Sequence, residues 1–209
     1  QGTTLKSNGS GSDYALFELS ENPPENYEIH YAGWSAVDVA PPQPVAIHHP
    51  SGDIKKISFD YDTGISDGWS GNDGSHWRVA DWEDGTTEPG SSGSPLFDGF
   101  NQRIIGQLYG GTASCTSITY DTYGKTSTSW NLGMSNYLDP LNTGATYLDG
   151  MDAIDLPDPE LSYSVDDLIF DLSDGDTDVS LIDISNTGED ESMLAYSLKI
   201  SEFENPMGG

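Results

Sequence analysis

Short apolar runs separated by turn-forming residues recur along this chain, and they limit what it can fold into. Its 209 residues include 24 glycines and 12 prolines. Glycine permits positive φ and proline fixes φ, so both favour tight turns. Apolar runs of about four to eight residues bounded by such turns are typical of β-strands. The sequence therefore predicts an all-β fold, with aromatic residues supplying much of the core.

The expected strands cover residues 13–19, 27–34, 44–48, 55–61, 76–82 and 103–109. Short strands separated by turns in this way are typical of a β-barrel. A loop rich in Gly, Ser and Asp is expected at residues 63–75, and a polar stretch follows the last of these strands and ends at Ser129. The spacing of Met134, Leu138 and Leu141 predicts one short helix over residues 135–141.

Composition changes near residue 149. From Asp149 to Gly209 there are seventeen acidic residues and one basic residue, Lys199. We predict three parts: residues 1–150 as one domain, 151–160 as a linker, and 161–209 as an acidic β-sandwich-like module. This module has only about four expected strands, fewer than the seven or so of an immunoglobulin-like sandwich, so we expect it to be partial.

The net charge of −28 argues against nucleic-acid binding, because a polyanion is repelled by most of such a surface. No apolar run approaches the roughly 20 residues of a membrane span. The chain begins at Gln1 without the pattern of a signal peptide, so we expect any signal and propeptide to lie outside it.

The most informative motif is Gly90-Ser91-Ser92-Gly93-Ser94-Pro95. Small residues on both sides of Ser92 allow a sharp turn that exposes its hydroxyl. Such a turn also aims the backbone amides of Gly90 and Ser92 at one point, where a tetrahedral oxyanion could be stabilised. The strands expected before and after the turn distinguish it from an ordinary flexible loop.

This turn resembles the nucleophile turn of chymotrypsin-like serine proteases, and its surroundings resemble one branch, the bacterial lysyl endopeptidases. The matching motifs are Ala46-Ile47-His48-His49-Pro50-Ser51-Gly52, Thr87 to Pro95, Gly106-Gln107-Leu108 with Gly110-Gly111, and Thr128-Ser129-Trp130. The resemblance runs from about Thr4 to Asp149. It implies the C-terminal β-barrel of such a protease, preceded by the last strands of the first barrel.

The resemblance implies roles for individual residues. Ser92 would be the nucleophile, and the amides of Gly90 and Ser92 would form the oxyanion hole. Asp13 matches the triad aspartate, which orients the catalytic histidine. Taken alone, Asp13 is a turn residue before a strand.

Substrate binding is implied in the same way. Asp121 resembles the pocket aspartate that would pair with a lysine or arginine side chain, although its plain interpretation is a solvated loop carboxylate. Thr86 would lie at the pocket floor, and Leu108, Tyr109 and Gly110 would offer backbone groups to an extended substrate. Tyr109 departs from the family, which has histidine there, and this leaves the preference for lysine over arginine open. Trp69 would either flank the cleft or have a structural role.

The catalytic histidine is not identified among His30, His48, His49 and His76. His48 and His49 are interpreted as a strand end with one packed and one solvated side chain, and His30 and His76 as ordinary packing residues. We expect the catalytic histidine to lie upstream, in the first barrel. Cys115 is the only cysteine. Alone it would be a small buried residue, whereas the resemblance implies a disulfide to an upstream cysteine.

The expected whole protein is a secreted, monomeric serine endopeptidase that cleaves peptides or proteins after Lys or Arg, needs no cofactor and binds no metal. This chain by itself is expected to be inactive. An alternative is a degenerate, protease-like binding or adhesion module. The segment Asp174 to Asp178 could suggest a calcium loop, but a solvated turn is favoured. An α/β-hydrolase esterase is disfavoured because alternating strands and helices are missing.

Overall fold

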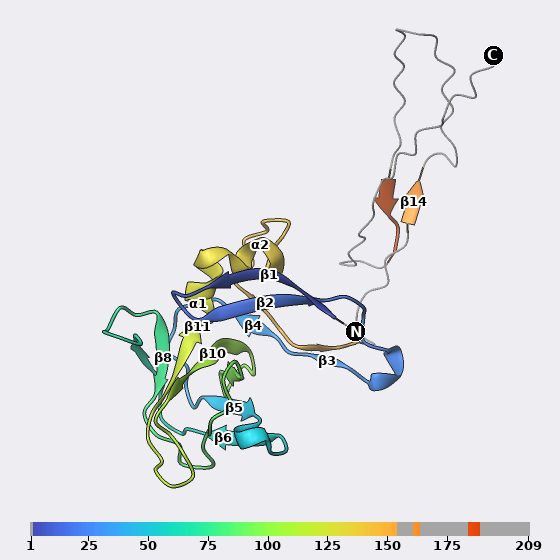
Figure 1. Cartoon of the computed structure of the whole chain (residues 1–209). Coiled ribbons are helices and arrows are strands. Elements are labelled where there is room, and N and C mark those ends of the chain that lie inside the picture. The colour runs from blue at the N-terminus through green and yellow to red at the C-terminus, as the bar shows by residue number, and fades with distance from the viewer. Residues whose placement is uncertain (1, 154–160, 164–183, 189–209) are drawn as a thin grey trace, which may run out of the picture. The chain divides into compact units, whose positions relative to one another are not determined.

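The computed structural model describes residues 2–153, 161–163 and 184–188. The chain divides into two compact units, Gln1–Ala153 and Ile154–Gly209, which are treated separately below (Figure 1). The strand β13 (Met151–Asp152) pairs with β3 (His30–Tyr31), so the first unit continues to Ala153, past the predicted boundary at residue 150.

The described elements are mostly short strands with a few helical turns. The remaining strands of the first unit are β1 (Thr3–Gly9), β2 (Tyr14–Leu19), β4 (Trp34–Ser35), β5 (Val45–His48), β6 (Lys56–Phe59), β7 (Ile65–Asp67), β8 (His76–Val79), β9 (Pro95–Phe97), β10 (Ile104–Gly111), β11 (Asp121–Lys125) and β12 (Tyr147–Leu148). Its helical segments are η1 (Glu25–Tyr27), η2 (Pro50–Gly52), α1 (Thr126–Ser129), η3 (Trp130–Met134) and α2 (Ser135–Leu138). The all-β fold with one short helical region is confirmed.

The main sheet has nine strands, seven of them in the order β6-β5-β9-β10-β11-β8-β7, with β4 and β12 attached to β10. Its two edge strands, β6 and β7, follow one another in the chain. The linking residues 60–64 can span only roughly 20 Å when fully extended, so the sheet must curl to bring its edges near one another. Among the described residues β6 and β7 do not pair, and the predicted barrel is therefore curled but not closed.

The strands β1 and β2 form a separate antiparallel hairpin (Figure 1). In the second unit, β14 (Leu161–Tyr163) pairs antiparallel with β15 (Ile184–Asn186). The other predicted strands of the sandwich-like module lie outside the described residues, as does the segment Asp174 to Asp178.

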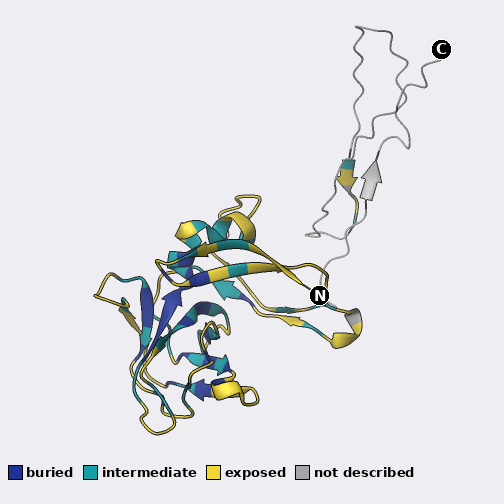
Figure 2. Ribbon diagram, viewed as in Figure 1, coloured by how far each residue is buried: buried dark blue, intermediate teal, exposed yellow. Residues whose placement is uncertain are grey.

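The core of the first unit lies against the central strands. Trp77, Val79, Leu96 and Tyr123 are at most 2% exposed and belong to one apolar cluster. Figure 2 shows the buried residues gathered on β8 and β11, while the β1–β2 hairpin is largely exposed. The core cluster therefore lies on the main sheet, and no described residue of the β1–β2 hairpin belongs to it.

The sequence did not predict six strands of the first unit (β1, β7, β9, β11, β12 and β13) or the start of the helical region. The strands β1 and β7 are mostly exposed and so lack an apolar alternation, whereas β11 is buried at every position and lacks a polar one. The helical region spans residues 126–138, earlier than the predicted 135–141. Its first turn is polar in sequence but is anchored by Ser129, whose hydroxyl lies 2.9 Å from that of Ser12.

A buried cation links β11 to the sheet edge. The Lys125 side chain is 1% exposed, and its ammonium donates to Asp38 (2.8 Å) and to the Ser66 hydroxyl (2.7 Å). The same ammonium lies 3.9 Å from the centre of the Trp77 ring. Such a charge is tolerated in the interior only while its partners remain.

We expect Asp38→Ala to lower the free energy of unfolding by about 1–2 kcal/mol, because it leaves the buried Lys125 ammonium partly uncompensated. Lys125→Met, which removes the charge and keeps the length, should cost less. Urea denaturation followed by tryptophan fluorescence measures this, since all five tryptophans lie in the first unit. Glu18→Ala, which breaks the exposed pair with Lys6, is the matched control and should change stability by less than about 1 kcal/mol. Equal effects of Asp38→Ala and Glu18→Ala would contradict the expectation.

Candidate active site

The predicted nucleophile lies in a tight turn before β9. Gly90 and Gly93 have φ values of 98° and 79°, which favour glycine. The Ser91 amide donates to Glu88 O, and the Gly93 amide donates to Leu108 O at 2.8 Å. Ser92 is exposed at the tip of the turn, whereas Ser91 is only 1% exposed. The turn therefore presents one serine to solvent and buries its neighbour.

The backbone amides of Gly90 and Ser92 are the predicted oxyanion donors. Within the described residues, neither amide has a hydrogen-bond acceptor. The neighbouring amides of Ser91, Gly93 and Ser94 all have one. The two free donors thus flank the exposed hydroxyl, as an oxyanion-binding turn requires.

Asp13 lies in the turn between β1 and β2 and is exposed, with φ of 50°. The turn is held against the main sheet, because the Gln107 side chain donates to Ser12 O at 2.7 Å. A Cβ at Gly124 would overlap Ser12 O, so only glycine permits this approach. These contacts place the Asp13 turn on the surface of β10 and β11.

Asp121 begins β11 and is 1% exposed, so it is not a solvated loop carboxylate. One of its oxygens, Oδ2, accepts from the Thr87 hydroxyl (2.6 Å) and from the Trp82 indole (2.7 Å). Burial raises the pKa of the Asp121 carboxyl, and the two hydrogen bonds act in the opposite direction. A Cβ at Gly111 would overlap the other oxygen, Oδ1. Asp121 is therefore a buried carboxyl whose two hydrogen bonds both go to Oδ2.

The predicted substrate strand is β10. At Tyr109 the pairing register with β11 shifts, so Tyr109 is an extra residue in the ladder and has no partner residue on β11. A Cβ at Gly110 would meet open space. Leu108 differs from the prediction, because its amide donates to Ser94 O at 2.9 Å and is not available to a substrate.

None of the four histidines, all of which the structure describes, forms a hydrogen bond with Ser92. His30 is exposed and pairs with Asp152, so it is not the ordinary packing residue that was predicted. His48 is buried, and His49 is exposed and bonded to Asp53 O, as expected for a strand end. The geometry therefore provides no base for Ser92 among these residues.

His76 is 3% exposed, and its Nδ1 lies 2.6 Å from the Ser75 hydroxyl. Its Nε2 has no hydrogen-bond partner, and the ring meets the edge of Tyr109 at 5.7 Å between centroids. Trp69 packs on the same Tyr109 ring at 4.1 Å. Burial lowers the pKa of His76, against the charges of Asp73 and Asp13. Trp69 and His76 together fix the position of Tyr109.

Sequence reasoning missed several residues of this region. Thr86, the predicted pocket floor, donates only to Thr87 O, and it is Thr87 that contacts Asp121. Trp82 was also not identified. The two adjacent threonines, Thr86 and Thr87, indicated a threonine near the pocket, but the sequence did not show which of them contacts Asp121. Cys115 is exposed, so its interpretation as a small buried residue is wrong.

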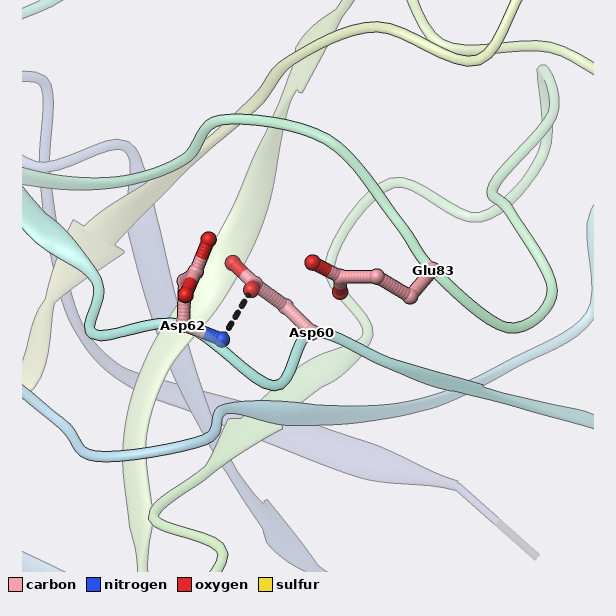
Figure 3. A group of neighbouring side chains, drawn as sticks. All are labelled: Asp60, Asp62 and Glu83. Carbon is pink, nitrogen blue, oxygen red and sulfur yellow. Dashed lines mark hydrogen bonds between the residues drawn. The ribbon is translucent and has the colours of Figure 1, made fainter.

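Three carboxylates form a cluster that the sequence analysis did not identify. Ligand oxygens of Asp60, Asp62 and Glu83 lie within 4.8 Å of one another (Figure 3). Asp60 is 2% exposed and accepts a hydrogen bond from the Asp62 amide at 2.8 Å. Burial, with the charges of its neighbours, raises the pKa of Asp60 to about 6. The cluster is far more costly to the fold than a solvated acidic surface.

In the part of the chain that the structure describes, no helix combines the length and apolar composition that crossing a bilayer requires.

Comparisons with known proteins agree with the motifs of this site. Residues 1–124 match the family described as "Lysyl endopeptidase, C-terminal domain". A lysyl endopeptidase from Pseudomonas aeruginosa is 37% identical over 112 residues, which are 51% of this chain and 23% of the relative. The chain thus spans about a quarter of the length of that relative. A solved structure of an inactive mutant of Rv3671c from M. tuberculosis H37Rv aligns with a TM-score of 0.41 and 14% identity, covering 64% of this chain and 63% of the other.

The family match covers more than half of the chain and includes the nucleophile turn, β10 and Asp121. The chain belongs to the lysyl endopeptidase C-terminal domain family.

Proposed function

We propose that this chain supplies the nucleophile, oxyanion hole, triad aspartate and specificity pocket of a secreted serine endopeptidase that cleaves after Lys or Arg. The observation that carries the proposal is the exposed Ser92 hydroxyl between two backbone amides, Gly90 and Ser92, that have no acceptor of their own. Two backbone donors left free beside a nucleophile are what stabilisation of a tetrahedral oxyanion requires.

The buried acid supports cleavage after a basic residue. Entry of an ammonium or guanidinium group into a pocket costs several kcal/mol of hydration, and only a nearby negative charge offsets it. Asp121 provides such a charge, fixed by Thr87 and Trp82. The bulge at Tyr109 and the open space at Gly110 suit an extended substrate beside the nucleophile turn.

The exposed hairpin suggests where the rest of the protease binds. Leu5, Phe17 and Leu19 are 49%, 54% and 59% exposed on β1 and β2. Burying these side chains against a further domain would bring a histidine from that domain to Asp13, at the end of the same hairpin. We therefore propose that the general base comes from outside these 209 residues.

The first test uses the chain alone. We expect no detectable hydrolysis of a lysyl ester, because acyl transfer by Ser92 needs a base within hydrogen-bond reach. Ser92→Ala is the matched control and should give the same background rate. Robust turnover that disappears in Ser92→Ala would show that one of the four histidines acts as the base, and would overturn this part of the proposal.

The second test restores the missing part. The segment of the Pseudomonas aeruginosa relative that precedes its matched 112 residues is joined to the N-terminus of this chain. We expect this joined protein to cleave lysyl peptides, and Ser92→Ala or Asp13→Asn to lower kcat by about 10⁴-fold or more. A folded joined protein that binds lysyl peptides without cleaving them would favour the binding or adhesion module instead. Arginyl substrates in the same assay determine the preference between Lys and Arg.

A further inference from the structure

A buried histidine contacts the residue next to the nucleophile. His48 is 2% exposed, and its Nδ1 lies 2.9 Å from the hydroxyl of Ser91. Its Nε2 lies 3.0 Å from the hydroxyl of Ser58, a residue with no exposed surface. Both nitrogens of the ring are therefore used, and both partners are buried. The three side chains form a continuous polar path from β6 to the nucleophile turn.

Local structure explains why His48 faces inward. The strand β5 alternates in burial, with Ala46 and His48 turned to the interior. It pairs with β6 on one side, where Ser58 faces Ala46, and with β9 on the other. The strand β9 directly follows the nucleophile turn, so the pairing brings the end of β5 under that turn.

The hydrogen-bond pattern fits a neutral imidazole. Ser91 Oγ accepts from the Glu88 amide at 3.4 Å, which leaves its own proton for His48 Nδ1. The opposite nitrogen, Nε2, then donates to Ser58 Oγ. Burial, with a smaller contribution from the charge of His49, lowers the pKa of His48 and favours this neutral form.

We propose that His48 is a positioning residue: its hydrogen bond to the Ser91 side chain fixes the turn that holds Ser92 and the free amides of Gly90 and Ser92. This role deepens the proposed function and rests on it, because the turn is the part that would do the chemistry. His48 does not act on substrate, since neither the ring nor Ser91 reaches the surface. Without this bond, the two exposed glycines of the turn provide little resistance to rearrangement.

Two substitutions of His48 separate its two hydrogen bonds. His48→Asn places a polar atom near the position of Nδ1 and keeps the Ser91 contact, whereas His48→Gln places one near Nε2 and keeps the Ser58 contact. Both remove the ring, so each controls for the loss of packing in the other. Ser91→Ala removes the partner and leaves His48 in place, and it provides an answer if both His48 variants unfold.

The measurement is amide hydrogen exchange by NMR on the full chain, without substrate. The reporting amides are those of Gly93 and Ser94, which bond to Leu108 O and Ser91 O. We expect exchange of both to be about tenfold faster in His48→Gln and in Ser91→Ala, the effect of one lost hydrogen bond, and close to wild type in His48→Asn. Amides of the β10–β11 ladder should not change.

Equal exchange at Gly93 and Ser94 in His48→Asn and His48→Gln would overturn the proposal, as would wild-type exchange in Ser91→Ala. Faster exchange throughout the sheet in all variants would mean that His48 stabilises the fold by packing alone, and this outcome would also contradict the proposal. This result does not depend on catalysis. A joined protease that fails to cleave peptides would refute the proposed function while leaving the exchange pattern as it is.

Discussion

Asp121→Asn is expected to stabilise the chain and to disable the protease that contains it. The substitution is nearly isosteric, and the asparagine oxygen can still accept from Thr87 and Trp82. The carboxyl of Asp121 has a raised pKa in the folded chain because it is buried. Its ionised form therefore destabilises the fold wherever the unfolded chain would already have released the proton.

The sign of the stability effect follows from linkage. With the folded pKa above the unfolded pKa, the cost is absent at low pH, grows as pH rises through the two values, and then stays constant. We expect Asp121→Asn to unfold at higher urea concentration than wild type near neutral pH and at about the same concentration below the unfolded pKa. Glu21→Gln, which neutralises an exposed carboxylate after β2, should show no such difference.

The effect on activity has the opposite sign. In the joined protease, the lysyl ammonium would enter a pocket without its counter-charge, and removing one partner of a buried ion pair costs about 3–5 kcal/mol. That corresponds to a fall in kcat/KM for lysyl peptides of about 10²-fold to 10³-fold or more. Glu21→Gln should retain activity. If Asp121→Asn cleaved lysyl peptides normally, or destabilised the chain, Asp121 would be an ordinary structural acid.

The part of the site that could be predicted is the part encoded within one turn. Gly90 and Gly93 flank Ser92 in the sequence, and each takes the positive φ that makes glycine necessary there. A conformational requirement within one turn restricts the residue types of that turn, so it can be recognised from adjacent residues in the sequence. Asp13 was identified through resemblance and not through geometry, and the structure places its turn on β10 and β11 without testing its role.

The contacts that fix the site could not be predicted, because they join distant residues. Trp82 and Thr87 reach Asp121 across 39 and 34 residues, and His48 reaches Ser91 across 43. Each contact depends on which strands pair, and short strands do not encode their partners. The strand β11 shows this most clearly, because all five of its residues are buried and neither face carries a pattern.

The curl of the sheet could not be predicted for the same reason, because it depends on which strands pair. Six strands were recognisable as elements, but the order of strands puts consecutive β6 and β7 at opposite edges. Only the short connection at residues 60–64 then forces the edges together. That connection contains Asp60 and Asp62. Glu83 is held beside them (Figure 3), because its amide donates to Phe59 O and its carboxylate accepts from the Tyr61 amide. The acidic cluster is thus a product of topology.

Asp60→Asn is expected to give the largest gain in stability of any substitution considered for this chain. The pKa of Asp60 is raised to about 6 from 3.8, mainly by burial, with the charges of Glu83 and Asp62 acting in the same direction. A difference of this size corresponds to about 2–3 kcal/mol against folding once the carboxyl is ionised in both states. Asparagine removes the charge, can accept the Asp62 amide as before, and can donate to a neighbouring carboxylate.

The pH dependence distinguishes this cause from a change in packing. The folded pKa lies above the unfolded one, so the cost in wild type is absent below about pH 4, develops between about pH 4 and 6, and is complete at about pH 7 and above. The stability difference between Asp60→Asn and wild type should follow that curve in urea denaturation.

EDTA is included because a divalent cation held by the three carboxylates would mask their repulsion. Asp62→Asn, at the same cluster but with the buried Asp60 carboxyl retained, should show a smaller gain over the same range. A gain from Asp60→Asn that is equal at about pH 4 and pH 8 would mean that the buried charge is not what limits the stability of the fold.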